Sequence, residues 1–207
     1  MAGAHSSARY LGADFLRLLS YRYQLVYATR AAHASVLVIG KGDGLVPGFL
    51  RSLGANVLTA DINRSLRPDI ISDVRQLSLV DAAVDVSMCC QVLEHLPFDQ
   101  FRAALTELRR VTRLYLILSL PDVRRHWRVR LEAGRFLLDG QGSLPQFRAQ
   151  PFPTASRAKI GHRWEIGFRG FPFRAVRRDI RSAGWEIVES ARVHEFPWHT
   201  FLYCRAV

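Results

Sequence analysis

Residues 36–44, Val-Leu-Val-Ile-Gly-Lys-Gly-Asp-Gly, constrain the fold of this chain more than any other stretch. Four apolar residues in a row are typical of a buried strand in a parallel sheet. The three glycines let the backbone turn sharply and approach a ligand, because no Cβ stands in the way. A helix is expected over Leu45–Leu53, with its N-terminal amides facing that ligand. This order is how α/β folds hold a nucleoside-bearing cofactor, although such a loop can also be a plain turn.

Strands and helices alternate through most of the remaining sequence. A helical stretch is expected over Tyr10–Arg30, and further helices over Phe98–Val111 and Phe173–Ala183. Strands are predicted over Val36–Ile39, Asn56–Ala60, Ile70–Ser72, Val84–Cys89 and Leu114–Leu120. Two more strands, Trp185–Val193 and Thr200–Ala206, read as an antiparallel hairpin. The predicted fold class is therefore α/β, a Rossmann-like doubly wound sheet that is mostly parallel, with an antiparallel C-terminal edge hairpin.

The chain length of 207 residues fits a single domain. Within it we expect an N-terminal helical cap over 1–33, a cofactor-binding core over 34–121, a lid or acceptor insertion over 122–170, and a C-terminal helix and hairpin over 171–207. Residues 122–164 show no clear period, and Gln141–Pro153 reads as an exposed loop or lid. No repeat marks a second domain.

The formal net charge is +11, which raises the question of a nucleic-acid partner. The cations are almost all arginines spread along the chain in pairs, which is as expected for solvated helix faces. No apolar run approaches the roughly 20 residues of a membrane helix, and no signal-peptide pattern begins the chain. The three cysteines form no disulfide framework or zinc spacing, so we expect a cytoplasmic protein.

An acidic residue stands at the end of the second predicted strand. Asp61 follows Gly40 by 21 positions. In dinucleotide-type folds an acid about 20 positions after the glycine loop accepts hydrogen bonds from ribose hydroxyls. The alternative is a helix cap or a turn aspartate near Asn63. Because loop, spacing and strand end agree, we predict the ribose role.

The following segments strongly resemble the class I S-adenosylmethionine-dependent methyltransferases, in particular the small-molecule type 11 branch. The resemblance is carried by the glycine loop, Asp61, Asp73-Val74, the strand Val84-Asp85-Val86 and the string Leu93-Glu94-His95-Leu96-Pro97, in that order. It extends over residues 34–121 and includes the apolar strand Leu116–Pro121. It implies an enzyme that uses S-adenosylmethionine.

By position, the resemblance implies a set of cofactor-binding residues. Gly40, Lys41, Gly42 and Gly44 would wrap the amino-acid and ribose end, and Asp61 would hold the ribose diol. Ile62 and Val74 would lie beside the adenine, whose amino group Asp73 would bind. Cys90 and Gln91 would lie near the transferring methyl group.

One position departs from the family pattern. The family has Asp or Glu two residues before the first glycine, and this chain has Val38. That acid helps to hold the cofactor's ammonium group. Its absence implies weaker binding, a substitute acid such as Asp43, or an inactive relative of the enzymes; we predict an active enzyme.

The acceptor is expected to lie over the carboxyl ends of the strands. Methyl transfer requires the acceptor to be positioned and to lose its proton. His162 with Glu165, near Trp164, suits proton removal from a hydroxyl, although both could instead cap a turn. His95 is a further catalytic candidate, while Glu94 reads as part of a helix start. Weaker candidates are His126, His194, Glu195 and His199.

The predicted function is methyl transfer from S-adenosylmethionine to an O or N atom of a small-molecule acceptor: a sugar, a secondary metabolite or a lipid-linked glycan. Two alternatives remain, a methyltransferase acting on RNA or another macromolecule, and a non-catalytic binding or scaffold protein of the same fold. No metal site is expected, because Cys89 and Cys90 would lie on opposite faces of one strand. The sequence does not indicate the oligomeric state.

Overall fold

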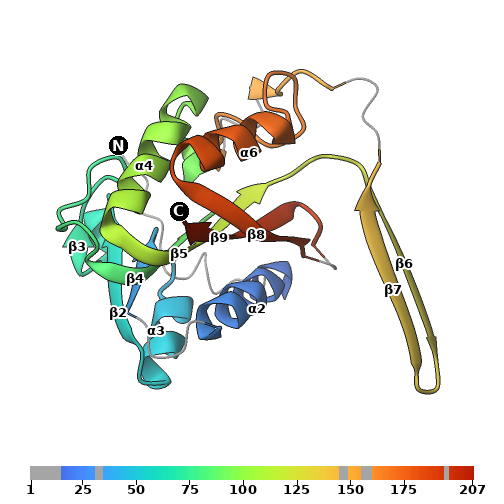
Figure 1. Ribbon diagram of the computed structural model, residues 1–207, viewed down its shortest axis with the longest axis horizontal. Helices are drawn as coiled ribbons and strands as arrows, with labels where there is room; N and C mark the ends of the chain where they lie inside the picture. The colour runs from blue at the N-terminus through green and yellow to red at the C-terminus, as the bar shows by residue number, and fades with distance from the viewer. Residues whose placement is uncertain (1–14, 31–34, 145–148, 155–159, 194–195) are drawn as a thin grey trace.

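The computed structural model of the chain describes residues 15–30, 35–144, 149–154, 160–193 and 196–207. At its centre is a seven-stranded sheet in the order β3-β2-β1-β4-β5-β9-β8 (Figure 1). The first five strands pair in parallel: β1 (Ser35–Ile39), β2 (Asn56–Asp61), β3 (Ile70–Ile71), β4 (Val84–Cys90) and β5 (Thr112–Pro121). β9 (His199–Ala206) pairs antiparallel with β5, and β8 (Trp185–Arg192) pairs antiparallel with β9. The predicted fold class is confirmed, including the antiparallel hairpin at one edge.

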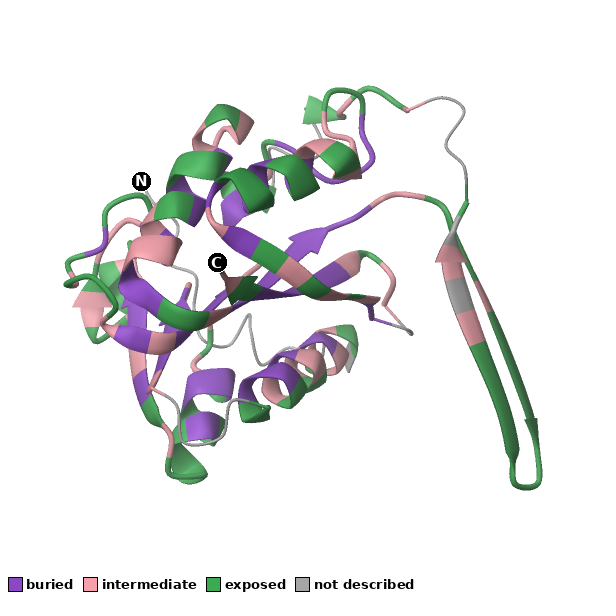
Figure 2. Cartoon of the chain, in the orientation of Figure 1, coloured by how far each residue is buried: buried purple, intermediate pink, exposed green. Residues whose placement is uncertain are grey.

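Helices cover both faces of this sheet (Figure 1). On one face, α4 (Phe101–Val111) and α6 (Phe173–Ser182) share a core with Leu37 and Ile39 of β1. On the other, α2 (Phe15–Thr29) and α3 (Leu45–Ser52) pack on Val36 and Val38. Successive strand residues point to opposite faces, so the unbroken apolar run of β1 supplies both cores. Figure 2 shows the buried residues concentrated along these central strands.

Most of the predicted elements occur within a few residues of their expected bounds. The expected helix Tyr10–Arg30 is observed from Phe15, and its first residues lie outside the described part of the chain. The helix predicted from Phe98 starts with a 3-10 turn, η3 (Phe98–Gln100), before α4. Two other 3-10 turns, η1 (Arg64–Leu66) and η2 (Leu93–His95), follow β2 and β4. Both turns follow the carboxyl ends of parallel strands, so they lie at the same edge of the sheet.

Residues 122–164 show no clear period in the sequence, yet part of this segment forms two strands. β6 (His126–Ala133) and β7 (Phe136–Ser143) form an antiparallel hairpin that extends away from the sheet (Figure 1). Gly140 and Gly142 of β7 interrupt the alternation that predicts strands, so the pattern is weak in the sequence. The start of the predicted loop Gln141–Pro153 therefore belongs to β7.

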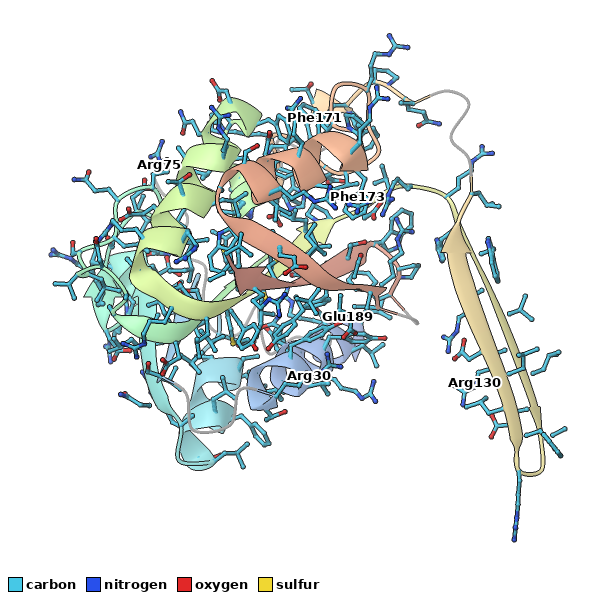
Figure 3. The ribbon with its side chains drawn as sticks, in the orientation of Figure 1. Arg30, Arg75, Arg130, Phe171, Phe173 and Glu189 are labelled. Carbon is cyan, nitrogen blue, oxygen red and sulfur yellow. The ribbon has the colours of Figure 1, made fainter. Side chains whose placement is uncertain are left out.

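This hairpin is amphipathic. The register pairs Leu131 with Leu138 and Ala133 with Phe136 on one face, since residues opposite each other share a face. On the other face Arg128 pairs with Asp139, at 2.8 Å. Most of its residues are exposed (Figure 2), and Arg130 lies on it far from the other labelled side chains (Figure 3).

A buried carboxylate ties the hairpin's base to the sheet. Asp122 follows β5 and accepts a hydrogen bond from Thr200 Oγ1 at 2.7 Å. It also pairs with Arg124 Nη2 at 2.7 Å and with Arg192 of β8. At the same edge, Arg30 after α2 reaches Glu189 of β8 at 2.5 Å (Figure 3). Burial opposes ionisation of Asp122, but the two arginines outweigh it and hold the pKa of this carboxyl below its usual value.

Asp122→Asn is expected to lower the free energy of unfolding at neutral pH by about 3–5 kcal/mol, because it leaves buried guanidinium groups unpaired. A carboxyl with a depressed folded pKa stabilises above the unfolded pKa of about 4 and loses that contribution as the pH falls. The difference between the two proteins should therefore shrink below about pH 4 in urea unfolding curves. Asp139→Asn on the exposed hairpin is the matched control, with a loss under about 1 kcal/mol. Equal losses for Asp122→Asn at all pH values would contradict this account.

Candidate functional site

A cleft of about 710 Å³ opens at the carboxyl ends of β1, β2 and β4. In parallel α/β sheets this edge is where ligands bind. The glycine loop and the residues after β2 and β4 form its base, and α2 contributes Ser20, Tyr21 and Gln24. Ile160 and His162, from the predicted lid segment, complete the lining.

The backbone conformation of the glycine loop, residues 40–44, favours glycine at three positions. Gly40, Gly42 and Gly44 all have positive φ, of 75°, 58° and 80°, a region that other residues rarely adopt. A Cβ on Gly40 would lie 2.5 Å from Val92 Cγ2. Gly40 and Gly42 line the cleft, whereas Gly44 lies at the N-cap of α3, outside the lining.

Asp61 holds this loop against β2. Its Oδ2 accepts a hydrogen bond from the Lys41 amide, and its Oδ1 accepts one from the Asn63 amide, both at 2.8 Å. A carboxylate oxygen has two lone pairs, so each oxygen retains an acceptor position. Ile62, next in the chain, lines the cleft with 72% of its surface exposed.

The predicted adenine residues also line the cleft. Val74 is buried, and Asp73 is held by Arg75, whose Nη2 lies 2.5 Å from Asp73 Oδ2. Hydrogen bonds from Arg75 lower the pKa of Asp73 and outweigh its partial burial. Asp73 is thus kept as an acceptor. Arg75 itself points outward from the surface (Figure 3).

Val38 and Asp43 lie in the same lining. Val38 is buried against α2 and α3. Asp43 is exposed at the loop, where its Oδ1 accepts a hydrogen bond from the Leu45 amide at 3.0 Å and its Oδ2 accepts one from Tyr21 Oη at 2.7 Å. Burial and the Asp43 carboxylate raise the pKa of Tyr21, so this phenol stays a donor. Val38 therefore gives the cleft an apolar side chain, and Asp43 gives it a carboxylate.

At the end of β4, Cys89 and Cys90 lie on opposite faces of the strand, as expected. Cys89 packs in the core beneath α4, while Cys90 borders the opposite core and lines the cleft. Burial raises the pKa of Cys90 to about 12, so it is a neutral thiol. Gln91 has a φ of 56°, a conformation that costs a non-glycine residue about 1–3 kcal/mol.

The three predicted catalytic residues come together at one end of the cleft. His162 Nδ1 lies 2.7 Å from Glu165 Oε1. The His95 ring stands nearly perpendicular to the His162 ring, with 5.1 Å between the centroids. Both histidines line the cleft, and Glu165 is buried behind them. The sequence places His162 and Glu165 three positions apart but gives no reason to join them to His95.

Glu94 belongs to this cluster, although its sequence context indicates only a helix start. Its side chain is fully buried, and its Oε1 lies 3.9 Å from His162 Nε2. With the orientation of the Gln91 amide assigned from the hydrogen-bond network, Gln91 donates to Glu94 Oε1 at 3.2 Å and to His199 Nε2 at 3.2 Å. Burial raises the pKa of Glu94 to about 8.

The weaker catalytic candidates lie in different parts of the structure. His199 lines the cleft, and burial lowers its pKa to about 4, so it is neutral. His126 lies on the exposed hairpin, outside the lining. His194 and Glu195 lie outside the described residues.

Residues 160–166 are fastened to the segment after β4. The Arg163 amide donates to Glu94 O at 2.8 Å, and Trp164 Nε1 donates to Leu96 O at 3.1 Å. The Trp164 ring packs on Phe98 and Phe101, with centroids 4.9 and 5.0 Å away. This packing sets the position of the neighbouring His162.

Comparison with known proteins agrees with this geometry. Residues 37–114 match the protein family described as "Methyltransferase domain". This part of the chain is a methyltransferase domain. It contains β1, the glycine loop, Asp61, Asp73, Glu94 and His95, and it confirms the resemblance seen in the sequence.

Solved structures share the fold of this methyltransferase domain and its C-terminal elements. The N-methyltransferase NodS of Bradyrhizobium japonicum WM9, in complex with S-adenosylhomocysteine, is 13% identical with a TM-score of 0.66, over 98% of this chain and 93% of that one. Magnesium protoporphyrin IX methyltransferase of Synechocystis PCC 6803, with bound S-adenosylmethionine, is 16% identical with a TM-score of 0.59, over 93% and 82%.

A third structure is 1,6-didemethyltoxoflavin-N1-methyltransferase of Burkholderia thailandensis, 17% identical with a TM-score of 0.54, over 100% and 92%. At these identities the likeness establishes the fold. No curated protein matches the chain. Among the described helices, none combines the length and the apolar character that crossing a bilayer requires.

Trp164→Ala is expected to lower the free energy of unfolding by about 3–5 kcal/mol, because it empties a buried site between Phe98 and Phe101. Urea denaturation followed by circular dichroism would measure the change. Trp198→Ala, at a tryptophan with 54% of its surface exposed, is the control and should change stability by under about 0.5 kcal/mol. Similar losses in the two variants would show that Trp164 does not fasten the lid segment.

Proposed function

We propose that the protein is an S-adenosylmethionine-dependent methyltransferase that acts on an oxygen or nitrogen atom of a small molecule. The observation that carries the proposal is the open cleft in the methyltransferase domain, with the glycine loop, Asp61 and the histidine cluster around it. A sugar, a secondary metabolite or a lipid-linked glycan would suit such a site. The cofactors named with the structural neighbours support S-adenosylmethionine as the methyl donor.

The residues around the cleft fit this cofactor. Asp61 offers acceptor positions to a ribose diol, and the loop at Gly40 lets the backbone come close to it. Ile62 and Val74 provide apolar surface for an adenine, and Asp73 provides an acceptor for its amino group. When bound, S-adenosylmethionine supplies a methyl group on a positively charged sulfur.

The protein's part in the reaction is to orient the acceptor and to promote loss of its proton. His162, held by Glu165, and His95 are the proposed catalytic residues. They lie at the end of the cleft near Cys90 and Gln91, where the methyl group is expected. A hydroxyl needs this help more than a neutral amine, so the cluster favours an oxygen acceptor.

The distribution of the basic side chains supports a small-molecule acceptor rather than RNA. Lys41 and Arg17 are the basic residues, besides histidines, among the described residues that line the cleft. Other arginines pair with carboxylates on many elements, as in Arg51–Asp69, Arg113–Asp85 and Arg205–Glu186. A nucleic-acid enzyme would need cations clustered at the cleft mouth. The open cleft likewise supports an enzyme over a scaffold protein.

We propose the cytoplasm as its location. All three cysteines are free thiols, which is typical of proteins from reducing compartments.

Asp61→Ala is expected to abolish binding of S-adenosylhomocysteine in isothermal titration calorimetry, whereas the unaltered protein binds it in the micromolar range. Asp61→Asn, which keeps the shape of the side chain, should weaken binding strongly. Asp99→Ala on the exposed η3 turn is the control and should bind normally. No heat and no thermal shift with the unaltered protein would refute the proposed function.

Asp43→Asn tests whether this residue replaces the family acid missing at Val38. It should weaken S-adenosylhomocysteine binding about tenfold, the effect of losing one charged hydrogen bond. It should leave binding of 5′-methylthioadenosine unchanged, because that ligand lacks the ammonium group. Glu186→Gln on β8 is the control. An equal loss for both ligands would assign Asp43 to loop structure instead.

A further inference from the structure

Two histidines in the cleft each have one ring nitrogen anchored. His162 Nδ1 is held by Glu165 at 2.7 Å. His95 makes a hydrogen bond with the Gly161 backbone, and Nδ1 is its ring nitrogen nearest to Gly161. Histidines that bind metals almost always use one nitrogen in this way, with a carboxylate or a carbonyl, and present the other to the ion.

A buried carboxylate faces the same place. Glu94 Oε1 lies 3.9 Å from His162 Nε2, a separation that two ligands about 2.1 Å from one ion can span. Glu94 Oε2 is buried and has no hydrogen-bond partner among the described residues. Buried carboxylate oxygens are normally satisfied, so this one indicates a missing partner. Ligand atoms of Glu94, His95 and His162 all lie within 4.8 Å of one another.

We propose that Glu94, His95 and His162 bind one divalent transition-metal ion. Two imidazoles and one carboxylate suit zinc, manganese, iron or cobalt and leave open coordination positions. His95 and His162 line the cleft, so the open positions face the cleft. Glu165 is a positioning residue that holds His162, and Gln91 does the same for Glu94.

The catalytic role of this metal site rests on the proposed function, because it requires an acceptor hydroxyl that is methylated in the cleft. A hydroxyl bound to the ion has a lowered pKa, as water on zinc does. Its proton passes to solvent water, and the alkoxide remains paired with the cation. His162 and His95 then act as ligands, and the acceptor is an alcohol or phenol whose oxygen can reach the ion.

The chain offers a direct test with cobalt. Tag-free protein, stripped with a chelator, is titrated with Co²⁺ alone and followed by visible d–d absorption and by calorimetry. One ion should bind per chain. Glu94→Gln, His95→Gln and His162→Gln should each weaken binding by about 100-fold, and Glu165→Gln by about 10-fold, as expected for a positioning residue.

Two control variants test whether Co²⁺ binds at the proposed site and not at another histidine or at a cysteine. His126→Gln, on the exposed hairpin, should bind Co²⁺ normally, and Cys90→Ser should retain the d–d bands, which shows that no thiolate is a ligand. S-adenosylhomocysteine titrations of the same metal-free variants should give near-normal affinity for Glu94→Gln, which shows that the variant is folded.

The outcomes separate this inference from the proposed function. Normal S-adenosylhomocysteine binding without Co²⁺ binding, or Co²⁺ binding unchanged in Glu94→Gln and His162→Gln, would overturn the metal site and leave the methyltransferase intact. One cluster-dependent Co²⁺ per chain without cofactor binding would support the site and refute the proposed function.

Discussion

The site depends on the burial of Trp164. Its ring fills the space beside Phe98 and Phe101, and its indole donates to Leu96 O. This fastens residues 160–166 across the segment that follows β4, and the Arg163 amide adds a bond to Glu94 O. His162 reaches Glu94 and His95 because of this junction. A loose segment here would leave the cleft with its proposed cofactor end and without its proposed acceptor end.

The two ends of the cleft are built by different physical means. The cofactor end uses backbone: positive-φ glycines, a strained Gln91 and Asp61 bound to the Lys41 amide. The acceptor end uses buried side chains, in which Glu165 and Glu94 stand on either side of the His162 ring. Burial makes the Glu94 carboxyl costly to ionise. Such a cluster is tolerated where it binds or reacts with something.

Much of the fold could be predicted because the pattern is local. Four apolar residues before Gly40 indicate a buried strand, and Asp61 after the next strand must meet the loop at the same edge of a parallel sheet. The hairpin β6–β7 escaped prediction because Gly140 and Gly142 interrupt its alternation. Its strands also lie away from the core, so burial imposes no strong pattern on them.

The sequence by itself determined the α/β fold, the glycine loop and the residues expected around the cofactor, since these follow from short-range spacing and strand order. Only the tertiary structure decided that His162 stands beside Glu94 and His95. The reason is physical. These contacts join segments whose separation in the chain carries no information about distance, and long-range packing around Trp164 brings them together.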